Sequence, residues 1–188
     1  MDQSVKFNEL LNKSIFLAQN LDYFNALACL NNLISNDYQL PPEIIYSSYC
    51  LRGQIKFKLK DFKNSIKDFD TAIELNPSNH YLYQYRADSK QGIYLYTEAL
   101  EDYDIAINLN PSDSNNFLKK GNLEFKLKNY KEALKNFDIV LKKDPINYCA
   151  IVMKEFALEN LYQSSKLNLF SMKLNNSCSK FQIYLSNY

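Results

Sequence analysis

The side chains that could carry chemistry are few and widely scattered in this sequence of 188 residues. A Ser–His–Asp or Cys–His catalytic site would have to use His80, the single histidine, which has no recognisable nucleophile context. A zinc site needs about four cysteine or histidine ligands at short spacing, and the four cysteines lie far apart. We therefore predict no catalytic residues and no metal site.

Two other kinds of site lack their sequence pattern as well. Three widely separated glycines cannot form a loop that cradles phosphate, so no cofactor is expected. Aspartate and glutamate are numerous, but none stands in the apolar setting that general acid–base catalysis uses. We interpret the chain as a protein that is not an enzyme.

The cysteines and the apolar residues indicate a compartment. No Cys-x-x-Cys motif occurs, which favours reduced thiols at Cys29, Cys50, Cys149 and Cys178 and a cytoplasmic location. No apolar run is long enough to span a membrane, and the N-terminus lacks the pattern of a signal peptide.

Charge is nearly balanced overall but uneven along the chain. The formal net charge is +1, so no general field attracts a partner. Residues 80–113 hold two basic and six acidic side chains, whereas residues 114–147 hold eight and four. Solvated helix faces are the commoner meaning of such a pattern, and electrostatic steering of a partner is the alternative.

A proline-centred motif returns at Pro77, Pro111 and Pro145, 34 residues apart each time. Other positions repeat at the same interval, and each keeps one kind of side chain. The aromatic columns are Phe69, Tyr103 and Phe137; Phe62, Tyr96 and Tyr130; and Tyr49, Tyr83 and Phe117. The small columns are Ser65, Ala99 and Ala133, and Gly53, Ala87 and Gly121. Self-similarity at a fixed period indicates a stack of repeated units.

Each period is predicted to form two helices joined by a short turn. Within 61–77 the apolar and small residues recur at spacings of three, four and seven, which puts them on one helix face, and 43–59 is also helix-like. Because a residue before proline avoids the helical region, Asn76 should end the second helix. The expected caps are Ser78 and Ser112 for first helices and Asp61 and Asn129 for second helices.

These columns resemble the tetratricopeptide repeat, a 34-residue helix–turn–helix unit. The family's Ala-x3-aromatic motif is matched by Ser65 with Phe69, Ala99 with Tyr103 and Ala133 with Phe137. Basic residues replace the family's leucine before the glycine, at Arg52, Arg86 and Lys120. The family's tyrosine is replaced by Lys56, Lys90 and Glu124, and its tryptophan by Tyr49, Tyr83 and Phe117.

The resemblance implies an all-α, right-handed solenoid of antiparallel helix pairs over residues 1–162. We expect full repeats at 46–79, 80–113 and 114–147, a degenerate repeat at 7–40 and a capping helix at 148–162. The degenerate repeat aligns Tyr23 and Ala26 with later columns at a spacing of 39, which fits an insertion containing two prolines. Residues 163–188 are expected to be a weakly ordered or helical tail, which could mediate self-association.

In proteins similar to this one, the first helices line a concave groove that holds a peptide or a partner's helix. By alignment, the resemblance places these residues on that surface: Cys50, Leu51, Gln54, Phe57, Lys58, Tyr81, Gln84, Tyr85, Asp88, Asn115, Leu118, Lys119, Asn122, Phe125 and Lys126. Phe57 and Phe125 could equally be packing residues.

The resemblance implies a non-catalytic scaffold or adaptor that binds a partner protein in this groove. One alternative is RNA binding through Lys58, Lys119 and Lys126, which the near-zero net charge disfavours. Another is an accessory subunit of a larger enzyme or secretion assembly. Capture of a chaperone's C-terminal tail is disfavoured, because the aligned residues, among them Leu11, Ile15 and Leu51, do not supply the family's dicarboxylate clamp.

Overall fold

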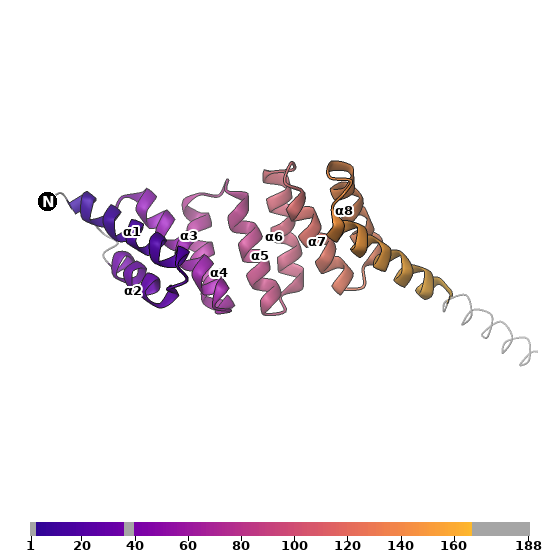
Figure 1. Ribbon diagram of the computed structural model, residues 1–188, viewed down its shortest axis with the longest axis horizontal. Helices are drawn as coiled ribbons and strands as arrows, with labels where there is room; N and C mark the ends of the chain where they lie inside the picture. Colours follow the sequence, from indigo (N-terminus) through magenta and orange to yellow (C-terminus); the bar gives the residue numbers. More distant parts are fainter. Residues whose placement is uncertain (1–2, 36–39, 167–188) are drawn as a thin grey trace, which may run out of the picture. The chain divides into compact units, whose positions relative to one another are not determined.

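The computed structural model describes residues 3–35 and 40–166, and within these ranges every regular element is an α-helix (Figure 1). The helices are α1 (Gln3–Gln19), α2 (Tyr23–Ile34), α3 (Pro42–Lys58), α4 (Phe62–Leu75), α5 (His80–Gly92), α6 (Tyr96–Leu109), α7 (Ser114–Lys126), α8 (Tyr130–Lys143) and a C-terminal helix described over 148–166. The predicted all-α class is confirmed. Most of the predicted tail lies outside the described residues, and its first four residues continue the C-terminal helix.

The chain divides into two compact units, Met1–Asn116 and Phe117–Tyr188, with the boundary inside α7. The N-terminal unit holds the pairs α1–α2, α3–α4 and α5–α6, and successive pairs pack through α2 on α3 and α4 on α5. First helices also contact one another, α1 on α3 and α3 on α5. The first helices α1, α3 and α5 therefore lie next to one another in this unit.

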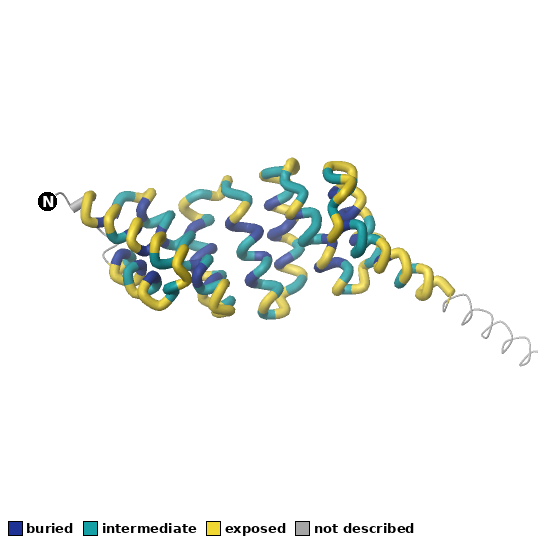
Figure 2. The backbone as a smooth tube through the Cα atoms, viewed as in Figure 1, coloured by how far each residue is buried: buried dark blue, intermediate teal, exposed yellow. Residues whose placement is uncertain are grey.

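Small residues let the two helices of a pair approach closely. A Cβ atom added to Gly53 of α3 would lie 2.8 Å from Cε1 of Phe69 in α4. Beside it, the Ser65 hydroxyl donates to the Gly53 carbonyl oxygen over 2.9 Å. Gly121 meets Phe137 in the same way, at 2.7 Å. Figure 2 shows buried and exposed residues alternating along the helices, as expected when one face of each helix is covered.

Each first helix from α1 to α7 ends in a turn centred on a residue with positive φ that is not glycine. These residues are Leu21 (62°), Lys60 (61°), Tyr94 (67°) and Lys128 (64°). After α3, the Asp61 N–H donates to the Lys56 carbonyl over 2.9 Å and the Lys60 N–H donates to the Phe57 carbonyl over 3.0 Å. These are the two bonds of a Schellman motif, whose central position suits glycine best.

A buried ion cluster joins the two helices of a pair. Asp68 of α4 is 2% exposed and accepts two hydrogen bonds from the Arg52 guanidinium, at 2.7 and 3.0 Å. Lys56 Nζ lies 2.7 Å from the same carboxylate. The cluster recurs one period later as Arg86, Lys90 and Asp102. Basic residues thus replace the family's leucine and tyrosine because they neutralise a buried aspartate on the second helix.

Arg86 also links one helix pair to the pair before it. Its Nη1 lies 2.6 Å from Oδ1 of Asp70 in α4, while its other nitrogens bond Asp102 in α6. Burial alone would lower the pKa of the Arg86 guanidinium, but hydrogen bonds and attraction from Asp102 and Asp70 outweigh burial and raise that pKa. The guanidinium is therefore a permanent cation between α4, α5 and α6.

The C-terminal unit carries other side chains at two positions of this cluster. Asn136 occupies the aspartate column and donates to the Glu132 carbonyl oxygen over 3.0 Å. Glu124 occupies the lysine column and accepts from Asn129 Nδ2 over 2.7 Å. The buried aspartate and its lysine partner therefore do not recur in α7 and α8, although Lys120 keeps a basic residue in the arginine column and the small and aromatic columns persist.

Two of the predicted caps are wrong, and two are right only in position. Asn76 ends α4 as expected, but Asn79, rather than Ser78, accepts the Tyr81 N–H over 3.0 Å and caps α5. Ser78 instead donates through both its N–H and its hydroxyl to Asn76 Oδ1. Likewise Asp113, rather than Ser112, accepts the Asn115 N–H at the start of α7. Asp61 and Asn129 stand at the N-cap positions, but neither side chain bonds a helix N–H.

Enlarging Ala99 should destabilise the fold. Its side chain is fully buried in the small column of α6, so Ala99→Leu overpacks the helix contact and should cost about 1–3 kcal/mol of unfolding free energy. The exposed neighbour Thr97 provides the control, since Thr97→Leu should stay within about 0.5 kcal/mol. Urea unfolding followed by circular dichroism measures both, and equal midpoints would refute the assigned register.

Glycine in the turn after α3 should stabilise the fold. A left-handed backbone costs an L-residue about 1–2 kcal/mol, and Lys60→Gly removes this cost. Glycine loses more backbone entropy on folding, which offsets part of the gain. The free energy of unfolding should therefore rise by about 0.5–1 kcal/mol. Lys67→Gly, at an exposed position in the interior of α4, should instead lower the free energy of unfolding by about 1 kcal/mol. If both variants lose the same amount of unfolding free energy, this account of the turn is wrong.

Candidate binding groove

The surface made by α1, α3 and α5 contains a hollow of about 460 Å³. Its walls combine aliphatic and aromatic side chains with a few neutral polar groups. The lining residues are Leu11, Ile15, Tyr46, Ser47, Cys50, Leu51, Gln54, Asn79, Tyr81, Leu82 and Tyr85. All belong to the N-terminal unit, and Figure 1 shows their three helices in succession along that unit.

A second hollow of about 330 Å³ adjoins the first and is lined by residues of α1 and α3 and by Tyr23 at the start of α2. It is lined by Ile15, Ala18, Gln19, Tyr23, Leu51, Gln54, Ile55 and Lys58. The two hollows share Ile15, Leu51 and Gln54, so these three side chains form the ridge between them. We call the two hollows with their ridge the groove.

The groove is almost uncharged. Among the described residues, no charged side chain lines the larger hollow, and Lys58 is the single one in the smaller hollow. Tyr81 is 54% exposed and Ile15 is 37% exposed, so apolar surface remains open to solvent here. An apolar surface with a few neutral polar groups has the composition of the core of a protein–protein interface.

Asn79 fixes the wall between α3 and α5. Its Oδ1 caps α5 at the Tyr81 N–H, and its Nδ2 donates to the Tyr46 hydroxyl over 2.7 Å. Burial raises the pKa of Tyr46, so its phenol stays neutral and available for this bond. The α5 cap thereby sets the position of the exposed Tyr81 ring relative to α3.

Tyr85 serves both the groove and the core. Its ring stacks on Phe69 at 5.7 Å between centroids and meets Phe57 edge-on at 6.1 Å. Phe57 also packs against Phe62 and lines neither hollow. Of the two readings that the sequence left open for Phe57, the structure therefore supports packing.

Two other predicted groove residues of α5 are held in hydrogen bonds. Gln84 is buried and accepts from Asn115 Nδ2 over 3.3 Å. Asp88 accepts from the Tyr103 hydroxyl over 2.5 Å. Burial, together with the Asp88 charge, raises the pKa of Tyr103, so the phenol keeps its proton. Neither Gln84 nor Asp88 lines the hollows.

The remaining predicted residues belong to the C-terminal unit, apart from Asn115 at the start of α7. Leu118 and Phe125 pack in a core cluster with Ala133, Phe137 and Ala157. Asn122 and Lys126 are exposed, and Lys119 is partly buried. Phe125 meets Tyr130 edge-on at 5.4 Å, so its side chain also packs.

Several residues that line the groove were not predicted from the sequence. Leu11, Ile15 and Tyr23 come from the degenerate repeat, where the 39-residue offset was the one available signal. Tyr46 lies in the N-terminal part of α3 and Asn79 is the N-cap of α5, positions that the alignment did not assign to the groove.

Cys50 is the one thiol in the groove, and it is held protonated. Burial raises the pKa of Cys50 from 9.0 to about 11, although a hydrogen bond with Tyr46 opposes this. Within the described ranges Cys29, Cys50 and Cys149 are free thiols. The groove thiol is therefore a small packing group rather than a nucleophile at neutral pH.

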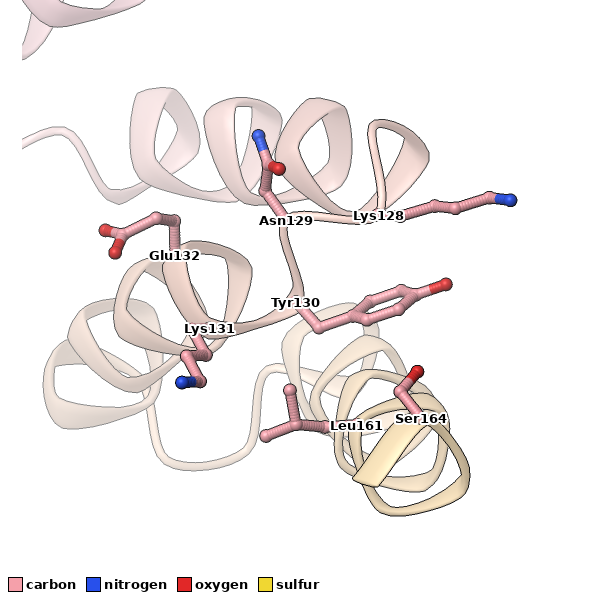
Figure 3. A pocket seen from close by; sticks show the side chains of 7 residues that line it. All are labelled: Lys128, Asn129, Tyr130, Lys131, Glu132, Leu161 and Ser164. Carbon is pink, nitrogen blue, oxygen red and sulfur yellow. The ribbon is translucent and has the colours of Figure 1, made fainter. Parts of the chain in front are cut away.

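The C-terminal unit has a hollow of its own, of about 560 Å³. Lys128, Asn129, Tyr130, Lys131 and Glu132 line it from the start of α8. Figure 3 shows Tyr130 extending toward the C-terminal helix, which contributes Leu161 and Ser164. Its lining residue Ser164 lies two residues before the end of the described range, and we assign this hollow no ligand.

Residues 3–35 and 40–166 contain no group of three or more His, Cys, Asp or Glu side chains that could hold a metal ion. In the same ranges, no helix combines the length and the apolar character needed to cross a membrane.

Comparison with known proteins identifies the repeat. Residues 46–79 match the family model for the tetratricopeptide repeat. A stretch of 38 residues, 20% of this chain, is 50% identical to the Protein STIP1 homolog of Dictyostelium discoideum, and it spans 7% of that protein's length. Residues 46–79 therefore form a tetratricopeptide repeat, and the described helix pairs share the fold of solved tetratricopeptide repeat structures.

Solved structures share this fold. A tetratricopeptide repeat protein from Parabacteroides merdae superposes with a TM-score of 0.77 at 20% identity, covering 86% of this chain and 62% of that one. A MamA protein gives 0.75 at 13% identity, covering 88% of each chain. The second such domain of human RPAP3, solved with the HSP70 peptide SGPTIEEVD, gives 0.58 at 28% identity, covering 62% of this chain and 98% of that domain.

Alkylation should reveal the protonated thiol of Cys50. At pH 8 a pKa near 11 makes the thiolate fraction of Cys50 about a hundredfold smaller than a pKa of 9.0 would. A thiolate of higher pKa is the better nucleophile, which raises the alkylation rate again by about tenfold. Iodoacetamide should therefore modify Cys50 at least about tenfold more slowly in the folded chain than in urea, as peptide mapping can measure. The alkylation rate of Cys50 in the folded chain should keep rising between pH 9 and pH 10. A plateau in that range would show instead a thiol of ordinary pKa that the fold shields from the reagent.

Proposed function

We propose that this chain is a non-catalytic adaptor that holds a segment of a partner protein in the groove formed by α1, α3 and α5. The observation that carries the proposal is the pair of adjoining hollows with exposed apolar side chains on the first-helix surface. Two similar proteins support it, because the first and second repeat domains of RPAP3 were solved with chaperone peptides bound.

Nucleic acid is a weaker candidate for this groove. Single-stranded RNA needs a cationic track beside its stacking rings, and Lys58 is the one cation that lines either hollow. The other lysines considered, Lys119 and Lys126, belong to the C-terminal unit. A role as an accessory subunit of a larger assembly is compatible with the proposal, since such a subunit would use the same groove.

The proposal can be tested by removing apolar side chains from the rim of the groove. A display library of random dodecapeptides is selected on the wild-type chain, and the affinity of the best binder is measured by fluorescence anisotropy. Tyr81→Ala combined with Ile15→Ser should weaken binding at least about thirtyfold, since truncation of a buried anchor typically costs 2 kcal/mol or more.

Tyr94 provides the matched control. It is 76% exposed, lies in the turn between α5 and α6 and lines neither hollow. Tyr94→Ala should leave the affinity within about twofold, and every variant should keep the wild-type circular dichroism spectrum. If Tyr94→Ala abolishes binding while the groove variant retains it, the partner binds elsewhere.

A further inference from the structure

We infer that the groove selects an extended, uncharged segment that presents two large apolar side chains, one to each hollow, with its main chain bonded to Gln54 between them. The inference rests on the proposed function and specifies the chemistry of the partner. It sets this groove apart from one that recognises an acidic tail.

Two anchors follow from the arrangement of the hollows. Volumes of about 460 and 330 Å³ are each large enough for an aliphatic or aromatic side chain. Because Ile15, Leu51 and Gln54 line both hollows, one continuous segment can cross the ridge and fill both sides. Exposed apolar surface at Ile15 and Tyr81 makes burial of such side chains favourable.

An extended main chain follows from Gln54. Its side-chain amide lines both hollows, and it forms no hydrogen bond with any residue in the described ranges. A primary amide offers one acceptor and two donors, which match the C=O and N–H of a peptide unit. A helical partner has its own main-chain groups paired already, whereas an extended segment brings them unpaired.

The uncharged character of the bound segment follows from the residues that line the groove. With Lys58 as the single charged side chain, at the end of the smaller hollow, acidic groups along the segment would be desolvated without cationic partners. Two titratable groups that line the larger hollow, the Cys50 thiol and the Tyr46 phenol, have pKa values raised by burial and so remain uncharged at neutral pH. Charged residues in the partner should therefore lie outside the bound stretch.

The first experiment compares two matched probes by fluorescence anisotropy. One is SGPTIEEVD, the peptide bound by the RPAP3 domain, and the other is its neutral analogue SGPTIQQVN with a C-terminal amide. The neutral analogue should bind at least as tightly as the acidic peptide, with an affinity that changes less than threefold between 50 and 500 mM salt. Tenfold tighter binding of the acidic peptide, lost in Lys58→Ala, would overturn the inference but leave groove binding intact.

The second experiment tests the Gln54 contact by a double-mutant cycle. The tightest dodecapeptide from the display selection is methylated at each main-chain nitrogen in turn. At one nitrogen, methylation should weaken binding about tenfold to the wild-type chain and less than twofold to Gln54→Leu. If no position shows this coupling, or if the selected peptides are rich in acidic residues, the inference is wrong.

The two experiments separate this inference from the proposed function. Selection of peptides that depend on Tyr81 and Ile15 but are acidic, or that show no coupling to Gln54, rejects the inference alone. Failure to select any peptide, or selection of peptides that ignore both groove residues, rejects the proposed function as well.

Discussion

The close approach of two helices at a column of small residues is the constraint on which the rest of the structure depends. At Gly53 no Cβ can be accommodated, because the Phe69 ring fills the space that it would need. Ser14 stands in the corresponding place of α1, fully buried, with its hydroxyl bonded to the Leu10 carbonyl over 2.8 Å. Small size is therefore the requirement, and glycine is one way to meet it. Once the pairs are closed, α1, α3 and α5 come side by side and form the groove.

The sequence was enough to predict the helix pairs and their repeat, because small and aromatic residues at fixed offsets report directly on packing between neighbours. It misplaced the caps at Ser78 and Ser112, since serine, asparagine and aspartate stand side by side there and all cap well. It also could not give the reason for Arg52 and Lys56, whose shared partner Asp68 lies on the following helix.

The groove was harder to predict than the fold. Alignment places a residue on a first helix, but whether its side chain faces solvent depends on neighbours from other helices. Gln84 and Asp88 are held by hydrogen bonds from Asn115 and Tyr103, contacts that no single helix pattern contains. The degenerate repeat contributes Leu11 and Ile15 to the groove, residues that the alignment placed at the clamp positions but that the predicted groove list omitted. The chemistry of the groove, apolar and nearly uncharged, therefore emerges only when three helices are assembled.

The central claim is that this assembled surface binds a partner segment, and Cys50 allows a direct test because its thiol lines the larger hollow. The measurement is the rate of Cys50 alkylation with and without a saturating peptide, with the exposed Cys149 of the C-terminal unit as the internal reference. Our account predicts that bound peptide slows alkylation of Cys50 at least about fivefold and leaves Cys149 unchanged. Protection of Cys149 with no change at Cys50 would contradict it.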